Sequence, residues 1–159
     1  LVFLNIKGIY VQIGTPPSGI SQKALTIFLI IVIIISSVYL LKDKGIKGII
    51  IGIGIFFIFM NILPDVLTGV EYTSFSSPDN EEKFVVIERG IGQLYKVSNS
   101  GLYMIFLTDI RTDDGYKPFS DGAYKLEWVS SEKLIIHYAF DYMDKNIFDD
   151  YREISIPLK

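Results

Sequence analysis

Few side chains in this chain could carry out chemistry, and none of them stands in a recognisable catalytic arrangement. His137 is the single histidine and there is no cysteine, which excludes multi-histidine metal sites, thiolate nucleophiles and zinc–sulfur sites. His137 also lies in a stretch whose residues alternate as in a strand, on the opposite side from Tyr138. We therefore expect a histidine on the surface of a sheet rather than a catalytic or ligand residue.

Carboxylates are the abundant reactive groups, and they cluster in two loops. Residues 141–150, with the sequence DYMDKNIFDD, carry four aspartates, and residues 109–115 carry three aspartates and a glycine. Calcium needs several oxygens from one loop, but neither spacing is that of an EF-hand. Aspartate and glycine are also common turn residues. The sequence favours solvated turns at both places. It predicts no metal, no cofactor and no enzymatic activity, with a carboxylate-based activity as the weaker alternative.

A short glycine motif, Gly90-Ile91-Gly92, could suggest a phosphate-binding loop. Such a loop needs further glycines and then the start of a helix, whereas residues 93–97 read QLYKV and resemble a strand. The nucleophile signature G-x-S-x-G and the zinc signature H-E-x-x-H are both absent from the sequence. The motif therefore predicts a hairpin turn.

Two long apolar runs dominate the first part of the chain. Residues 24–41 form a run of 18 without a charge, and residues 48–63 form a run of 16 without a charge. A membrane-spanning helix needs roughly 20 mostly apolar residues. The first run is longer than the apolar region of a signal peptide and lacks a small-residue cleavage site. The sequence predicts a two-helix transmembrane hairpin over residues 24–63.

The distribution of charge separates this hairpin from the rest of the chain. Residues 1–64 carry five lysines and one acid, a net charge of +4, whereas residues 65–159 carry ten basic and 17 acidic groups, a net charge of −7. An acidic domain has no electrostatic basis for binding nucleic acid. The basic link at residues 42–47 has three lysines against two before the first run. The positive-inside rule then favours a cytoplasmic link with both termini outside.

Small residues near the link suggest how the two helices pack. Gly48 and Gly52 form a GxxxG pattern, and Ser36 and Ser37 lie at a similar distance from the link on the other helix. Small residues allow helices to approach closely in lipid. The alternative is that glycine is simply frequent in membrane helices. We expect a contact of Ser36 and Ser37 against Gly48 and Gly52. Neither run contains an ionisable residue, which argues against a pump, channel or transporter.

The remainder of the chain has the alternation of β-strands. Strands are expected over residues 84–89, 94–97, 102–107, 124–128, 134–140 and 154–158, separated by turns and by an exposed loop at residues 111–122. The continuous apolar run at residues 102–107 is typical of a strand buried on both faces. An antiparallel meander or a small sandwich is the natural arrangement, with an aromatic core. The expected core residues are Phe84, Tyr95, Tyr103, Phe106, Tyr124, Trp128, Tyr138 and Phe140.

Two resemblances follow from these residues. Ser77-Pro78-Asp79-Asn80, followed by a strand with a charged end, resembles the SPDG-type entry into the blade strands of bacterial propeller proteins, but it occurs only once. The layout of residues 24–140 is similar to small Gram-positive membrane proteins of unknown function, which join a two-span hairpin through a Ser-Pro-containing connector to a β-rich tail. The late tryptophan strand of that tail is represented here by Glu127-Trp128. This resemblance implies a fold and no activity.

The sequence therefore predicts an α+β membrane protein, a transmembrane hairpin followed by a small antiparallel all-β domain. The expected divisions are an N-terminal tail (1–23), the hairpin (24–63), a connector (64–80) and the β-rich domain (81–159). Its expected location is the cell membrane, as a multi-pass protein with an extracytoplasmic C-terminal domain. That domain is expected to be a binding or sensory module at the envelope, with the lipid bilayer and an envelope or membrane protein as partners. The alternative is an immunity or stress-resistance membrane protein that acts through its hairpin.

Overall fold

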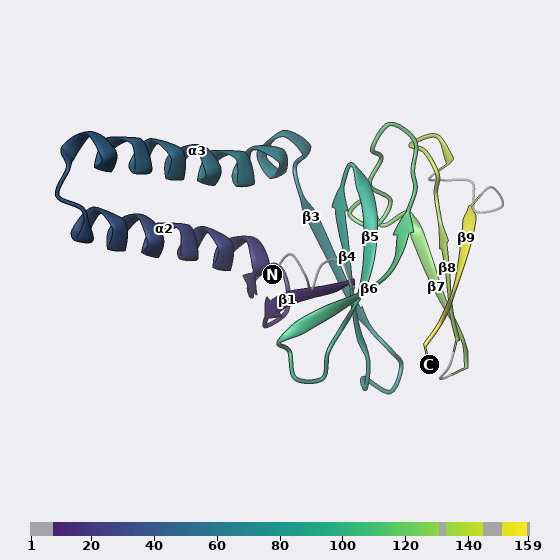
Figure 1. The fold of residues 1–159 in the computed structure, drawn as a ribbon. Coiled ribbons are helices and arrows are strands. Elements are labelled where there is room, and N and C mark those ends of the chain that lie inside the picture. Colours follow the sequence, from purple (N-terminus) through teal and green to yellow (C-terminus); the bar gives the residue numbers. More distant parts are fainter. Residues whose placement is uncertain (1–7, 131–132, 145–150, 159) are drawn as a thin grey trace.

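A computed structural model describes residues 8–130, 133–144 and 151–158 (Figure 1). Two long helices form a hairpin that projects from a domain of two antiparallel sheets. In chain order the elements are β1 (Ile9–Ile13), β2 (Ile20–Ser21), α2 (Gln22–Leu40), α3 (Lys44–Thr68), β3 (Glu71–Ser76), β4 (Lys83–Arg89), β5 (Ile91–Val97), β6 (Tyr103–Ile110), β7 (Tyr124–Ser130), β8 (Lys133–Tyr138) and β9 (Arg152–Pro157).

The larger sheet has six strands in the order β2-β1-β6-β5-β4-β3. Strands β3 to β6 form a meander, and Gly90, which has a positive φ of 70°, makes the tight turn between β4 and β5. Strand β1 pairs with β6 and is the second strand in the sheet order, next to the two-residue strand β2 at the edge. The six strands expected from the sequence are all present, as is the turn at Gly90.

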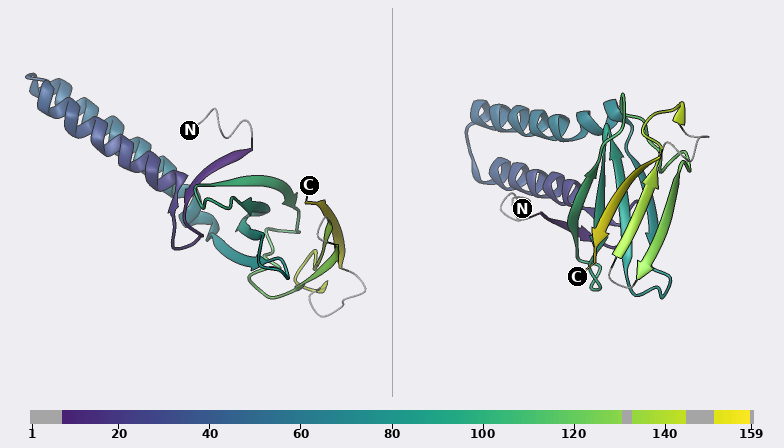
Figure 2. Two further views of the ribbon diagram at one scale, coloured as in Figure 1. Left: turned by 90° about the horizontal axis from the view of Figure 1, so that it is seen from below. Right: turned by 90° about the vertical axis from the view of Figure 1, so that its right-hand side faces the viewer.

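The smaller sheet, β7-β8-β9, packs face to face on the larger one and closes a sandwich (Figure 2). Alternation along the strands sends Phe84, Leu94 and Ile110 from one sheet and Leu134 and Ile136 from the other into a common core, where each is at most 1% exposed. The expected aromatic core is confirmed for Phe84, Tyr95 and Tyr138, which are buried. Phe106, Tyr124 and Trp128 are half-buried against the core.

Strand β6 is not buried on both faces along its whole length, contrary to the expectation from its apolar run. Tyr103 is 39% exposed and Ile105 is 40% exposed, because the larger sheet extends beyond the three strands that cover it. The expected core position of Tyr103 is therefore wrong. The loop at residues 111–122, in contrast, is less exposed than expected. Its Phe119 is 3% exposed and joins the core between the sheets.

The other face of the larger sheet points toward the hairpin and has a second apolar cluster. Val85, Tyr95, Val97 and Met104 are buried there. The hairpin, the larger sheet and the smaller sheet thus follow one another as three layers (Figures 1 and 2). This order places one face of the larger sheet against the ends of the two helices.

Each helix of the hairpin begins at a side-chain cap. The side chain of Ser21 accepts a hydrogen bond from the Ala24 N–H at the start of α2, and that of Asp43 accepts one from Ile46 at the start of α3. Helix α3 ends at Gly69, which has a positive φ of 58°. At 1.5 Å per residue, the two helices are about 28 Å and about 38 Å long, lengths that match the roughly 30 Å hydrocarbon core of a bilayer.

The two helices pack along seams with spacings of three and four residues, similar to those of coiled coils. The residues on these seams are Lys23, Ile27, Ile30, Ile34, Ser37 and Leu41 at the first helix and Lys47, Ile50, Gly54, Ile58, Asn61 and Asp65 at the second, and each is half-buried or buried. Gly54 is the buried residue of α3, and a Cβ added there would lie 2.7 Å from Cγ1 of Ile34. The helices therefore approach each other closely at Gly54.

The contact expected between Ser36–Ser37 and Gly48–Gly52 is not where this close approach occurs. A Cβ added at Gly48 or Gly52 would meet no heavy atom within 4 Å, and Ser36 is exposed. The serines and the glycines lie at similar depths along the two helices, but they do not all face the opposite helix. At about 100° per residue, Gly52 points some 160° away from the seam that contains Gly54. Ser37 does lie on the seam of α2.

Three boundaries expected from the sequence also differ. The tail at residues 1–23 supplies β1 and β2, and the connector at residues 64–80 contains β3. Helix α3 continues through Pro64 to Thr68, beyond the expected end of the hairpin at residue 63. Proline lacks an N–H donor and its ring crowds the carbonyl four residues earlier, yet the helix continues for four residues beyond Pro64, and the hydroxyl of Thr68 donates to the Pro64 carbonyl in the last turn.

Substitution of Gly54 by valine should destabilise the hairpin, whereas valine at Gly52 should not. The added side chain at Gly54 would overlap Ile34, and such overpacking costs about 1–3 kcal/mol. The measurement is thermal unfolding of both variants in detergent, followed by circular dichroism at 222 nm. Equal melting temperatures for the two variants would contradict the assignment of the helix contact.

Candidate functional site

A cavity lined by polar and aromatic side chains lies at the junction between the hairpin and the sandwich. It has a volume of about 400 Å³ and is lined by the first turns of α2, the last turns of α3 and the hairpin-facing side of the larger sheet. The lining side chains include three tyrosines, three glutamines and three charged groups: Tyr10, Tyr72, Tyr95, Gln12, Gln22, Gln93, Lys23, Asp65 and Arg89. A concave site with apolar walls and a few convergent polar groups is the usual form of a ligand pocket.

One carboxylate organises the charges in this junction cavity. Oδ1 of Asp65 lies 2.5 Å from Nζ of Lys23 and 2.9 Å from Nε of Arg89. The three groups come from α3, α2 and β4 respectively, so the ion cluster ties both helices to the sheet. The Nε–H of Arg89 is too poorly aligned with Asp65 to form a hydrogen bond, and this buried atom has no hydrogen-bond partner among the described residues. The cluster has two cations and one anion.

Aromatic side chains form the wall of the junction cavity on the sheet. The rings of Tyr10 and Tyr95 meet edge to face with their centroids 5.1 Å apart, and the Tyr95 hydroxyl donates to Oε1 of Gln93. Burial raises the pKa of the Tyr95 phenol, and the neighbouring Tyr10 raises it further. Tyr95 is therefore a neutral hydrogen-bond donor at physiological pH.

A second connection joins the end of α3 to the sandwich through the loop at residues 111–122. The ammonium of Lys117 lies 3.1 Å from the Thr68 carbonyl oxygen and also bonds to the carbonyl of Gly69. These carbonyls belong to the helix C-terminus, where a cation is favoured by the helix dipole. The same loop is held to β4 by Glu88, whose carboxylate accepts hydrogen bonds from Phe119 N (3.0 Å) and Ser120 N (2.8 Å).

Glu88 is unusual because it is a carboxylate that is 2% exposed. Burial raises its pKa above the usual 4.5, and the hydrogen bonds from the loop and the charge of Lys117 partly oppose this effect. The buried charge is therefore satisfied by two N–H donors and not by an adjacent ion pair. We assign it a structural role, the anchoring of the loop.

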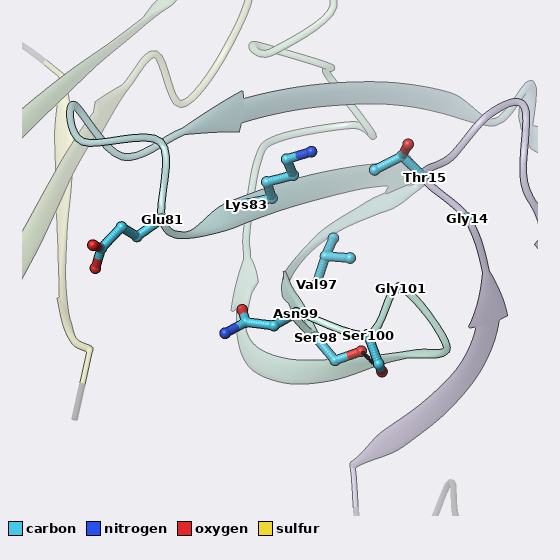
Figure 3. A pocket seen from close by; sticks show the side chains of 9 residues that line it. All are labelled: Gly14, Thr15, Glu81, Lys83, Val97, Ser98, Asn99, Ser100 and Gly101. Atoms are coloured by element: carbon cyan, nitrogen blue, oxygen red, sulfur yellow. Dashed lines mark hydrogen bonds between the residues drawn. The ribbon is translucent and has the colours of Figure 1, made fainter.

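A second pocket, of about 300 Å³, lies between the β1–β2, β3–β4 and β5–β6 turns (Figure 3). The side chains of Glu81 and Lys83 point in different directions in this pocket. The hydroxyls of Ser98 and Ser100 lie 3.0 Å apart and bond to each other or to backbone N–H groups of their own turn. With no convergent charged groups among its described residues, this pocket is a weaker candidate than the junction cavity.

The residues singled out from the sequence for chemistry occupy structural positions. His137 lies on the outer face of the smaller sheet, half-exposed, with Nε2 3.3 Å from Oε2 of Glu127, as expected for a surface histidine. Asp141 accepts hydrogen bonds from the N–H groups of Met143 and Asp144, which is turn chemistry. Asp149 and Asp150 lie outside the described residues. Within the described ranges, no group of three or more acidic or histidine side chains could hold a metal ion.

Sequence reasoning missed the junction altogether. From the sequence, Lys23 enters only the charge count of the positive-inside rule, and Arg89 is only the last residue of an expected strand. A signal was nonetheless present, because Lys23 immediately precedes the first apolar run and Asp65 follows the second. In a helical hairpin these two positions must lie side by side. The basic partner Arg89 could not be inferred without the sheet topology.

No family model, curated protein or solved structure matches this chain at a significant level. The site therefore has to be interpreted from its own geometry.

The raised pKa of Glu88 predicts a specific dependence of stability on pH. Because the folded protein holds this proton more tightly than the unfolded chain, the associated stabilisation is full below pH 4.5 and is lost as the pH rises through the folded pKa. A Glu88→Gln variant should lack this component, so its stability relative to the wild type should improve from pH 4 to pH 7. At any one pH the variant is expected to be less stable by about 1–3 kcal/mol, because glutamine leaves one loop N–H without an acceptor.

The measurement is the thermal unfolding of both proteins at several pH values. A difference in melting temperature between the wild type and Glu88→Gln that is the same at every pH would contradict a raised pKa for Glu88.

Proposed function

We propose that this chain is a membrane-anchored binding or sensory module at the cell envelope, with its recognition site in the junction cavity. The hairpin would cross the bilayer, and the sandwich would stand at the outer surface. The exposure of the hairpin is the observation that supports this proposal most directly.

Both helices are long and apolar enough to cross a membrane, with mean hydropathies of 2.4 and 2.3, yet 0% and 6% of their apolar windows are buried. The core helix of a soluble protein has the same composition but is covered by the rest of the fold. Soluble monomers rarely expose apolar patches larger than a few hundred Å². A lipid environment accounts for two such helices standing side by side without a protein cover.

Apolar exposure also continues from the hairpin onto the adjacent rim of the sandwich. Ile13 and Ile20, paired in the β1–β2 hairpin immediately before α2, are 42% and 49% exposed. Leu102, whose carbonyl accepts a hydrogen bond from Gln12 in the same region, is 55% exposed. These side chains fit a rim that touches the membrane interface.

The position of the junction cavity suits a sensory role. It lies where both helices meet the sheet, so an occupant would contact the anchor and the sandwich simultaneously. Binding there would be transmitted by the Asp65 cluster on one side and by Lys117 and Glu88 on the other. A site with no such connection could bind a ligand without affecting the anchor.

A second candidate function uses the hairpin itself, as in an immunity or stress-resistance membrane protein. The GxxxG face of Gly48 and Gly52 is open, because added Cβ atoms there would meet nothing within 4 Å. Such a face could accept a partner helix in the bilayer. Leucine at both glycines would then abolish function without loosening the hairpin, whereas the sandwich-based function would survive.

The proposal predicts that the link and the sandwich lie on opposite sides of the membrane. Because the chain has no cysteine, single cysteines at Lys42 and Lys125, both exposed, can report their location. A membrane-impermeant maleimide applied to intact cells should label Lys125→Cys, but should label Lys42→Cys only after permeabilisation.

A Phe57→Cys variant, in the middle of α3, is the control and should resist labelling in both conditions. The reversed pattern would place the sandwich in the cytoplasm and contradict the envelope location. Labelling of both sites from the same side would contradict a hairpin that crosses the membrane.

A further inference from the structure

We propose that the junction cavity binds the phosphate-bearing head group of an anionic membrane lipid, held by the side chains of Arg89 and Lys23. This inference rests on the proposed membrane anchoring and adds a ligand class to it.

The location of the cavity corresponds to the depth of lipid phosphates. Lys23 is the second residue of α2, and Asp65 lies one turn before the end of α3, so their charged groups mark the end of the apolar part of the hairpin. In an inserted hairpin, this level coincides with the head-group region. Basic pockets at the ends of membrane helices are typical binding sites for anionic head groups.

The charges of the cavity leave an excess that favours an anion. Among the described residues that line it, Asp65 is the one carboxylate, and it faces both Lys23 and Arg89. The carboxylate of Asp109 bonds to the Gln93 amide at 3.3 Å but does not line the cavity. The first turn of α2 and the last turns of α3 both reach this cavity, so the opposite ends of their helix dipoles offset each other and the excess rests on the two basic side chains.

Arg89 is also only partly engaged by its carboxylate partner. Its Nε is buried without a hydrogen-bond partner among the described residues, although it lies 2.9 Å from Asp65. Guanidinium groups form their strongest bonds to phosphate through two aligned N–H donors. A phosphate oxygen in the cavity could accept a well-aligned hydrogen bond from Arg89, which the carboxylate of Asp65 does not.

The walls and volume of the cavity fit a head group with the beginning of its acyl chains. A volume of about 400 Å³ lies within the usual range for small-molecule sites. Ile87 and Met104 provide apolar surface, and Tyr10 and Tyr72 provide amphipathic rings of the kind that favour the membrane interface. Two uncharged polar side chains in the wall already form hydrogen bonds within their own helices: Thr26 donates to Gln22 O, and Asn61 donates to Phe57 O. Specificity should therefore depend on the charges.

The test uses the full chain in a neutral detergent, titrated with phosphatidylglycerol or phosphatidylcholine and followed by native mass spectrometry. The wild type should bind phosphatidylglycerol at least about tenfold more tightly than phosphatidylcholine. Both lipids offer the same phosphate to Arg89 and Lys23, but the quaternary ammonium of choline would be repelled by the net positive charge of the cavity. Arg89→Gln and Lys23→Gln should lose this preference. The matched control Lys125→Gln removes a positive charge from the exposed face of β7 and should retain it.

Asp65→Asn provides a test in which the expected result is a gain of lipid affinity and not a loss. This variant removes the negative charge that competes for the two cations, while the asparagine retains a side-chain oxygen and Lys117 still holds the end of α3. Its affinity for phosphatidylglycerol should therefore increase. A folding defect would not produce such a gain. Equal affinity of the wild type for the two lipids, or an unchanged preference in Arg89→Gln, would overturn the proposal.

Two further experiments distinguish a failure of the lipid assignment from a failure of the proposed membrane anchoring. If glycerol phosphate binds as tightly as phosphatidylglycerol in an Arg89-dependent manner, the ligand is a free phosphate compound and the assignment to a lipid is overturned. Flotation with vesicles tests the underlying membrane anchoring. A chain that does not float with vesicles of either lipid contradicts the anchoring, whereas one that floats equally with both and shows no preference contradicts the head-group site alone.

Discussion

The arrangement of this molecule depends on a single carboxylate shared by three elements. Asp65 of α3 pairs with Lys23 of α2 and with Arg89 of β4, so the two helices and the larger sheet meet at one point. The apolar side chains of the helix seams cannot provide this connection, because they contact only the opposite helix; the charged residues Lys23 and Asp65 at the sheet end of the seams provide it. Ion pairs exposed to water contribute little, but the groups of this cluster are about one-third exposed or less, where charges interact more strongly. The cluster fixes where the hairpin leaves the sandwich.

The rest of the fold strengthens this junction from the side of the sandwich. Lys117 binds the C-terminal carbonyls of α3, and Glu88 holds the same loop by two backbone N–H groups. Phe119 of that loop is buried in the core between the sheets. A continuous set of contacts therefore leads from the end of a helix, through a loop, into the core. This path links the end of α3 at the junction to the core, and none of its residues lines the turn pocket in Figure 3.

Much of the fold could be predicted from the sequence, because its signals are local. Two uncharged runs determined the helices, and alternation determined β4 to β9. What could not be predicted depends on contacts between distant segments. Strand β1 pairs with the two-residue strand β2 and with the distant β6, and β3 lies among turn residues that conceal its alternation. Gly54, and not the GxxxG pair, forms the close helix contact, because angular position decides which small residue faces its neighbour. Asp65 and Arg89 are unremarkable separately and become a site only when the sheet brings them together.

A distance measurement tests the rigidity of this junction most directly. Spin labels on single cysteines at Ile33 in α2 and Lys125 in β7 would report how the hairpin is held relative to the sandwich by double electron–electron resonance. The structure predicts one narrow distance distribution in the wild-type background, which broadens when Lys23 and Arg89 are both replaced by glutamine. A broad distribution in the wild type, or an equally narrow one in the variant, would contradict the central role of the Asp65 cluster.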